Sequence, residues 1–106
     1  VGISTDFSVS PPEYTPATEI IGIAVTGAGD PKNHQPLTVK DVLVGLAEGS
    51  AKTTGKNDVG RLEVGYKADL VVFARDLYDV PKTDFNQTHP PVIATYLSGK
   101  QAYRRP

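Results

Sequence analysis

Few residues of this chain have the types needed for catalysis or metal binding, and three of them stand out: Asp6, His34 and His89. Carboxylates and imidazoles transfer protons and bind divalent cations. Cysteine is absent, which excludes a thiolate nucleophile, a disulfide framework and a cysteine zinc site. The two histidines stand near prolines, more than fifty residues apart, without His-x-His or His-x-x-x-His spacing. We therefore interpret both histidines as exposed loop residues.

Asp6 ends a short apolar run, residues 1–5, and precedes a Ser/Pro-rich loop at 7–13. From spacing alone, such a carboxylate accepts hydrogen bonds from backbone N–H groups in a turn. Asp69 follows a glycine turn and opens an apolar run, so a hydrogen bond at a strand end is its expected role. Three further aspartates are also expected in turns: Asp30, Asp58 and Asp76.

The composition limits the classes of function. The 106 residues suffice for one compact domain, and the formal net charge is -1 without a basic stripe. Nucleic acid is therefore not an expected partner, and the pair Arg104-Arg105 is too small to change that. No apolar run approaches the roughly 20 residues of a membrane span. We expect a cytoplasmic protein, and because the chain lacks an initiator methionine we expect a piece of a longer one.

Residues that must position these side chains follow helical patterns in the first half of the chain. Thr15 and Pro16 predict the start of a helix that ends at Gly27. Thr38 with Asp41 predicts the start of a second helix that ends at Gly55. Apolar residues recur at helical spacing in both: Ala17, Ile20, Ile21, Ala24 and Val25 in the first, and Val39, Val42, Leu43, Leu46, Ala47 and Ala51 in the second. In the second helix, Gly45 and Gly49 permit close approach of a neighbour.

Strands are expected after residue 56. Residues 62–64 predict a short strand, and the valine-rich run 68–74 predicts a strand buried on both faces. Residues 92–97 and 101–104 predict a hairpin joined by Ser98-Gly99-Lys100. Between these strands, residues 79–91 form an irregular polar segment.

Four segments, taken in this order and at these separations, carry a resemblance that covers nearly the whole chain. They are GISTDFSVSP at 2–11, LTVKDVL at 37–43, GRLEVGYKADLVVFAR at 60–75 and YLSGKQAY at 96–103. Together they resemble the amidohydrolase superfamily, specifically its amidohydrolase-3 type. Each segment alone is a weak signal.

The resemblance implies an α+β piece of a larger fold. Proteins of this family have a (β/α)8 barrel with its metal site at the C-terminal mouth of the strands. They also have a small composite β-domain built from both chain termini. Residues 1–56 would then supply the last barrel strand, at 1–5, and two helices. Residues 57–106 would supply the C-terminal strands of the small domain.

In the resemblance, Asp6 matches the family's aspartate, which is both a metal ligand and a catalytic residue. It accepts the proton of a metal-activated water and passes it to the leaving nitrogen. Zinc or another divalent metal is implied in the full-length parent, with histidine ligands that this chain lacks. The piece itself is expected to bind no metal. Phe7 departs from the family pattern, where tryptophan or a small residue is common.

The implied function is that of a metal-dependent hydrolase acting on non-peptide carbon–nitrogen bonds of small amides or cyclic amides. The piece alone is expected to be inactive. An alternative is a non-catalytic regulatory or interaction protein that retains the fold, since some family members are named exoenzyme regulatory proteins. Exposed sheet edges and helix faces predict that the piece self-associates.

Overall fold

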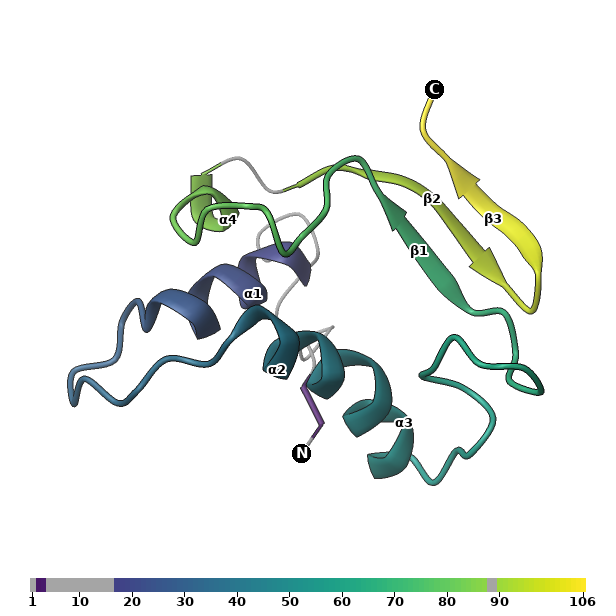
Figure 1. The fold of residues 1–106 in the computed structure, drawn as a ribbon, viewed down its shortest axis with the longest axis horizontal. Coiled ribbons are helices and arrows are strands. Elements are labelled where there is room, and N and C mark those ends of the chain that lie inside the picture. The colour runs from purple at the N-terminus through teal and green to yellow at the C-terminus, as the bar shows by residue number, and fades with distance from the viewer. Residues whose placement is uncertain (1, 4–16, 88–89) are drawn as a thin grey trace.

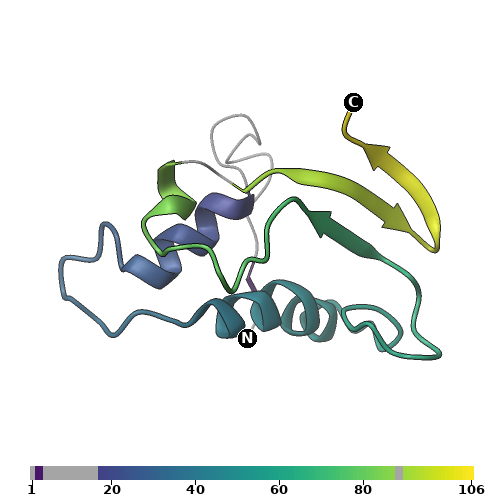
Figure 2. The ribbon, with the colours of Figure 1, turned by 45° about the horizontal axis from the view of Figure 1, so that its top comes forward.

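The computed structural model describes residues 2–3, 17–87 and 90–106, and it shows an α+β fold (Figure 1). In chain order the elements are α1 (Ala17–Thr26), α2 (Val39–Val44), the π-helical η1 (Gly45–Gly49), α3 (Ser50–Thr53), β1 (Leu70–Phe73), α4 (Asp84–Gln87), β2 (Val92–Leu97) and β3 (Lys100–Arg104). The helices gather on one side and the sheet on the other in both views (Figures 1 and 2). The α+β class predicted from the sequence is confirmed, whereas the barrel and composite-domain assignments stay predictions. None of the described helices is long and apolar enough to cross a membrane.

Helix α1 ends where the sequence predicts. Gly27 has φ +72°, and its N–H donates to the carbonyl of Ile23 at 2.9 Å. Glycine adopts this left-handed conformation without the steric cost of a Cβ, so the helix stops here. The predicted start at Thr15 and Pro16 lies outside the described residues.

A second helical run extends through α2, η1 and α3, and both of its ends match the prediction. The Thr38 hydroxyl accepts from the Asp41 N–H at 3.1 Å, and the Asp41 carboxylate accepts from the Thr38 N–H at 3.1 Å. The hydrogen bond from the Thr38 hydroxyl, followed by that from its N–H, lowers the pKa of Asp41. At the other end, Gly55 has φ +76°, and the Lys56 N–H donates to the Ala51 carbonyl at 2.9 Å. The run is thus capped at both termini.

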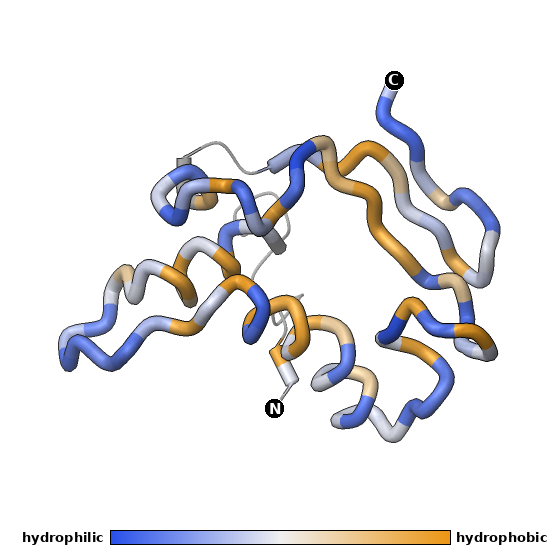
Figure 3. Tube along the Cα trace, viewed as in Figure 1, coloured by the Kyte–Doolittle hydropathy of each residue, from blue (hydrophilic) through white to orange (hydrophobic). Residues whose placement is uncertain are grey.

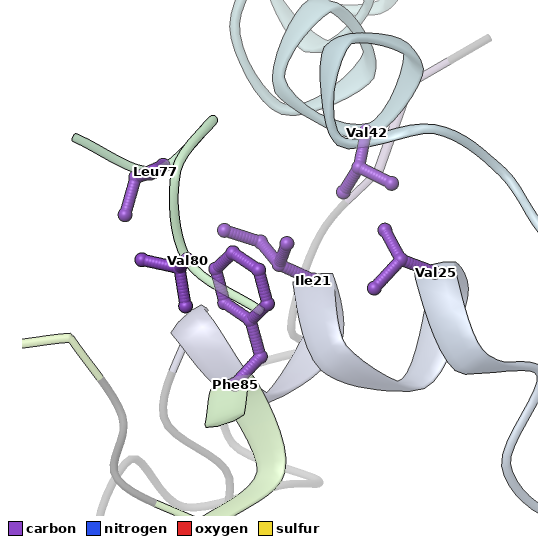
Figure 4. Packing of buried hydrophobic residues seen from close by; sticks show 6 residues of the cluster. All are labelled: Ile21, Val25, Val42, Leu77, Val80 and Phe85. Carbon is purple, nitrogen blue, oxygen red and sulfur yellow. The ribbon is translucent and has the colours of Figure 1, made fainter. Parts of the chain in front are cut away.

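A small core joins the helices to the segment after β1. Its buried members are Ile21, Val25, Val42, Leu77, Val80 and Phe85. Figure 4 shows the Phe85 ring between Val80 and Ile21. The prediction that residues 79–91 form an irregular polar segment was therefore wrong in part, because α4 lies there and fully buries Phe85. A lone phenylalanine among polar neighbours gives no periodic signal in the sequence.

The three strands form an antiparallel sheet in the order β1-β2-β3. Val71 pairs with Thr95, and Thr95 pairs with Tyr103. Ser98 (φ +50°) and Gly99 (φ +79°) both have positive φ, as the two-residue turns of tight hairpins require. The predicted hairpin is confirmed, with its second strand beginning at Lys100.

Two expectations about strands were wrong. The predicted strand at 62–64 is an irregular loop, in which the Leu62 side chain is 80% exposed. The predicted burial of 68–74 on both faces also fails, since Val71 is 49% and Val72 39% exposed. Strand β1 is an edge strand of the described sheet: its central residues Val71 and Val72 remain exposed, whereas Phe73 packs against the core. Figure 3 shows apolar stretches of β1 and β2 lying away from the helices.

The loop between α3 and β1 is fixed to the helical run at Gly60 and Arg61. Gly60 has φ +93°, and a Cβ on it would lie 2.9 Å from the Ala47 carbonyl oxygen. The Arg61 guanidinium lies 3.6 Å from the Glu48 carboxylate and 3.3 Å from that of Glu63. The chain therefore passes directly over the helix surface before it enters the sheet.

Candidate functional site

Asp6, the predicted catalytic and metal-binding residue, lies outside the described residues, as does His89. The structure does describe Gly2 and Ile3, which precede Asp6 in the chain, and the helical run on which they lie. The candidate site is therefore described through residues 2–3 and the helical run that they contact.

Ile3 is attached to the helical run through both of its backbone polar groups. Its N–H donates to the Gly45 carbonyl at 3.1 Å and lies 3.3 Å from the Ser50 Oγ. The Ser50 hydroxyl in turn lies 2.7 Å from the Ile3 carbonyl oxygen and 3.0 Å from that of Gly45. A hydroxyl carries a single proton, so the shorter contact, to Ile3, is its donor bond. Ile3 is thus hydrogen-bonded to a helix, and residues 2–3 do not form a strand.

The close approach depends on glycine. A Cβ on Gly45 would lie 2.6 Å from Cδ1 of Ile3, and a Cβ on Gly2 would lie 3.3 Å from the Gly49 carbonyl oxygen. Ordinary carbon contacts are nearer 3.5–4.0 Å. The prediction of a close neighbour is confirmed at Gly45, where the neighbour is Ile3, and the Gly49 carbonyl oxygen lies near Gly2 of the same segment.

The π-helical segment η1 coincides with this attachment. The N–H of Ser50 reaches the Gly45 carbonyl, five residues back, and the Ser50 hydroxyl and the Ile3 N–H lie at the same oxygen. Side chains and backbone groups that insert into the helical ladder are a known cause of such widened turns. Sequence reasoning missed Ser50. Its signal is a hydroxyl next to Gly49, one residue beyond the i, i+4 glycine pair.

His34 and Asp30 lie together in the loop after α1. The Asp30 carboxylate accepts from the Lys32 N–H at 2.9 Å and from the His34 N–H at 2.7 Å, and it lies 2.9 Å from His34 Nδ1. The Lys32 bond and then the His34 bond lower the pKa of Asp30. Both predictions are confirmed: Asp30 is a turn residue, and His34 is an exposed loop histidine.

Three other described aspartates also bind the chain itself. Asp69 accepts from the Ser98 N–H at 2.7 Å, as predicted for a strand end, and Asp76 accepts from the Tyr78 N–H at 2.9 Å, as predicted for a turn. Asp58 pairs with Lys67 at 3.4 Å. Throughout residues 2–3, 17–87 and 90–106, no three histidine, aspartate or glutamate side chains converge on one point. A hydrolytic metal site needs about three protein ligands, so the described residues do not fit a metal.

An open groove of about 730 Å³ separates the helical run from the sheet. Apolar side chains dominate its lining, including Leu43, Leu70, Val71 and Leu97. Its charged residues, Arg61 and Asp69, are already bonded to Glu48 and to the Ser98 N–H. The groove therefore presents mainly apolar surface, and its two charged lining residues are already engaged.

A sequence model of a protein family, described as the amidohydrolase family, matches residues 1–103. No curated protein and no solved structure matches the chain.

Proposed function

Because this chain belongs to the amidohydrolase family, we propose that it is the C-terminal part of a hydrolase that cleaves non-peptide carbon–nitrogen bonds of small amides or cyclic amides. The resemblance carried by the four sequence segments is confirmed by the match over residues 1–103. That match is the observation on which the proposal rests. Family membership supports hydrolase chemistry in general, and the bond and substrate class are our inference.

The division of the chain into two parts is also proposed from the family membership. Residues 1–56 would form the last strand and two helices of a (β/α)8 barrel, and residues 57–106 the C-terminal strands of a small composite β-domain. Two observations support it. The sheet stands apart from the helices (Figure 2), and apolar residues of β1 remain exposed, as expected for surfaces that other parts of a longer chain would cover.

Asp6 is the residue of this chain that we place in the chemistry. A divalent metal, when bound, would polarise the amide carbonyl and lower the pKa of a bound water. Since the described residues hold no ligand set, that metal would depend on residues beyond this chain in addition to Asp6. The role proposed for the Asp6 carboxylate is to accept a proton from the attacking water and then to release it to the leaving nitrogen.

A hydrolysis screen of the full-length protein tests the proposal. N-acyl and cyclic amide substrates are incubated with the protein, with and without added zinc, and after treatment with a chelator. We expect zinc-dependent hydrolysis of some member of these classes, and neither turnover nor stoichiometric zinc in the 106-residue chain alone. A full-length protein that binds zinc yet hydrolyses none of them would favour the regulatory alternative. Stoichiometric zinc in the short chain, found by metal analysis, would contradict the placement of the ligands.

We also propose that the 106-residue chain self-associates through the outer edge of β1. Among the described strands, β1 and β3 are the two edges of the sheet. An antiparallel pair of β3 strands centred on Ala102 would place Lys100 opposite Arg104 of the second copy. Like charges directly opposite each other destabilise a sheet. Strand β1, with sequence LVVF, carries no charge and pairs only on its β2 side.

The Val72→Lys substitution is expected to weaken this association by roughly tenfold or more, because each copy would bring a lysine to the shared edge. Sedimentation equilibrium at several concentrations measures the effect. Leu97→Glu is the control, since Leu97 is exposed on the central strand β2, away from the edge, and a glutamate there would lie opposite Lys100. A monomeric unsubstituted chain, or an association that Leu97→Glu abolishes and Val72→Lys does not, would contradict edge pairing.

A further inference from the structure

We infer that the π-helical turn η1 couples two contacts made on the helical run: the contact of Ile3 and that of the loop at Gly60. Residues 2–3 and residues 60–61 are far apart in the chain, yet both lie against the short stretch formed by η1 and α3. This coupling involves described residues alone and is independent of the proposed function.

The contact of Ile3 lies at the point where η1 departs from an α-helix. In an α-helix the Gly45 carbonyl would accept the N–H of Gly49, four residues later, but here it accepts that of Ser50. The Ile3 N–H donates to the same oxygen at 3.1 Å. A donor that inserts into the helical ladder is a known cause of such a widened turn. The presence of Ile3 therefore favours the π turn over an α turn.

Ser50 holds Ile3 from the far end of the π turn. Its hydroxyl donates to the Ile3 carbonyl oxygen at 2.7 Å, and its Oγ lies 3.3 Å from the Ile3 nitrogen. An α turn would move each residue after η1 around the helix axis by about one residue's step, and Ser50 would turn away from Ile3. Ile3 therefore binds the π form of the run more tightly than the α form.

The contact of Gly60 depends on the same turn. A Cβ on Gly60 would lie 2.9 Å from the Ala47 carbonyl oxygen, in η1, and 3.0 Å from the Ala51 Cβ, in α3. The Arg61 guanidinium adds a contact to the Glu48 carboxylate at 3.6 Å. Because these partners stand before and after the end of η1, an α turn would change their relative positions. The loop at Gly60 therefore also fits the π form better.

Two contacts that favour the same form of a two-state element stabilise each other. Loss of the Ile3 contact shifts η1 toward the α turn and weakens the contact at Gly60. Loss of the Gly60 contact weakens that of Ile3 by the same factor, since such coupling is reciprocal. Couplings of this kind are typically about 5- to 150-fold, so the effect is large enough to measure.

Hydrogen exchange of single amides in the 106-residue chain, followed by NMR, tests the coupling from the loop side. Gly60→Ala is expected to accelerate exchange of the Ile3 amide by roughly fivefold or more relative to the Leu37 amide. The Leu37 N–H donates to the Ala24 carbonyl at 3.0 Å and reports any general loss of stability. Gly65→Ala is the matched control and is expected to leave the ratio unchanged, since Gly65 has nearly the same φ but nothing within 4 Å of a Cβ.

Ser50→Ala tests the coupling from the Ile3 side. It is expected to accelerate exchange of the Lys67 amide, which closes the loop by donating to the Asp58 carbonyl at 2.8 Å, by a similar factor. Thr54→Val is the matched control, because the Thr54 hydroxyl bonds only carbonyls of the same helical run, at 3.1 and 3.0 Å, among the described residues. It is expected to leave the Lys67 amide unchanged.

NMR couplings across hydrogen bonds identify the amide that the Gly45 carbonyl accepts. We expect the amide of residue 50 in the unsubstituted chain, and a shift toward the Gly49 amide in Ser50→Ala. This measurement reports the turn itself, separately from the two contacts.

Equal exchange ratios of the Ile3 amide in Gly60→Ala and Gly65→Ala would overturn the inference. A Lys67 amide that stays protected in a Ser50→Ala chain whose Ile3 amide is released would also overturn it. A Gly45 carbonyl that remains bonded to the amide of residue 50 after Ile3 is released would show that the π turn does not depend on Ile3, and would overturn it as well.

Discussion

The Asp6→Asn variant of the full-length hydrolase is expected to lose roughly 100- to 10,000-fold in kcat, the range associated with removal of a group that transfers protons. Asparagine has nearly the shape of aspartate, but its amide cannot accept a proton at neutral pH. The loss would therefore report the proton transfer made by the carboxylate. Steady-state kinetics on the best substrate of the screen measure the effect. Metal content, determined on the same sample, separates loss of a ligand from loss of a proton carrier.

Asp76→Asn serves as the control for this substitution. Asp76 is an exposed aspartate whose carboxylate accepts the Tyr78 N–H in a turn at 2.9 Å, and an asparagine oxygen can accept the same bond. Its kcat is expected to equal that of the unsubstituted enzyme. Hydrolysis that survives Asp6→Asn at the full rate would remove Asp6 from the reaction.

The Gly60→Ala substitution is expected to produce the largest loss of stability, about 1–3 kcal/mol beyond that of Gly65→Ala. Gly60 and Gly65 have nearly equal φ values, +93° and +94°, so both variants place alanine in an unfavourable backbone conformation. Their surroundings differ. A Cβ on Gly60 would lie 2.9 Å from the Ala47 carbonyl oxygen and 3.0 Å from the Ala51 Cβ, whereas nothing lies within 4 Å of a Cβ on Gly65.

Chemical denaturation of the two variants measures this difference directly. The backbone term, of order 1–3 kcal/mol for a strained residue, is common to both and cancels in the comparison. The remaining difference is the free energy needed to move the loop away from the Ala47 carbonyl, because a backbone group cannot change rotamer to make room. Equal unfolding free energies would mean that the loop does not lie against the helix at Gly60.

Helix ends were predictable because their determinants are local. Thr38 and Asp41 cap each other across a single turn, and Gly27 and Gly55 adopt the left-handed conformation that stops a helix. The hairpin turn at Ser98 and Gly99 was predictable for the same reason. In each case the residues that decide the structure are neighbours in the sequence.

Features that depend on distant partners were not predictable. The run around Val71 and Val72 has the composition of a buried strand, but burial needs a covering element, and none of the described elements supplies one. Phe85 gives the opposite error. It lies among polar residues and is nevertheless fully buried, because α4 packs it against Ile21 of α1. Composition states what a strand or helix can bury, and only tertiary contacts state what it does bury.

For the candidate site, too, local features were predictable and contacts between distant residues were not. Asp6 stays a prediction, which the family resemblance makes from its place in a sequence pattern, and the glycine pair Gly45 and Gly49 predicted a close neighbour without naming it. Ser50 was not identified, because its partner Ile3 is 47 positions away. The predictions for Asp30, Asp69 and Asp76 were confirmed, since each accepts a hydrogen bond from a backbone N–H in a turn or at a strand end.

The widened turn at η1 sets the two halves of the helical run out of phase. A π-helical turn holds one residue more than an α-helical turn, and one residue corresponds to about 100° of rotation. Val42, before η1, points into the core, while Ser50, after it, points to Ile3. Deleting one residue between Val42 and Ser50 would restore a regular α-helix. The Ser50 hydroxyl would then be rotated by about a quarter-turn and would no longer face Ile3.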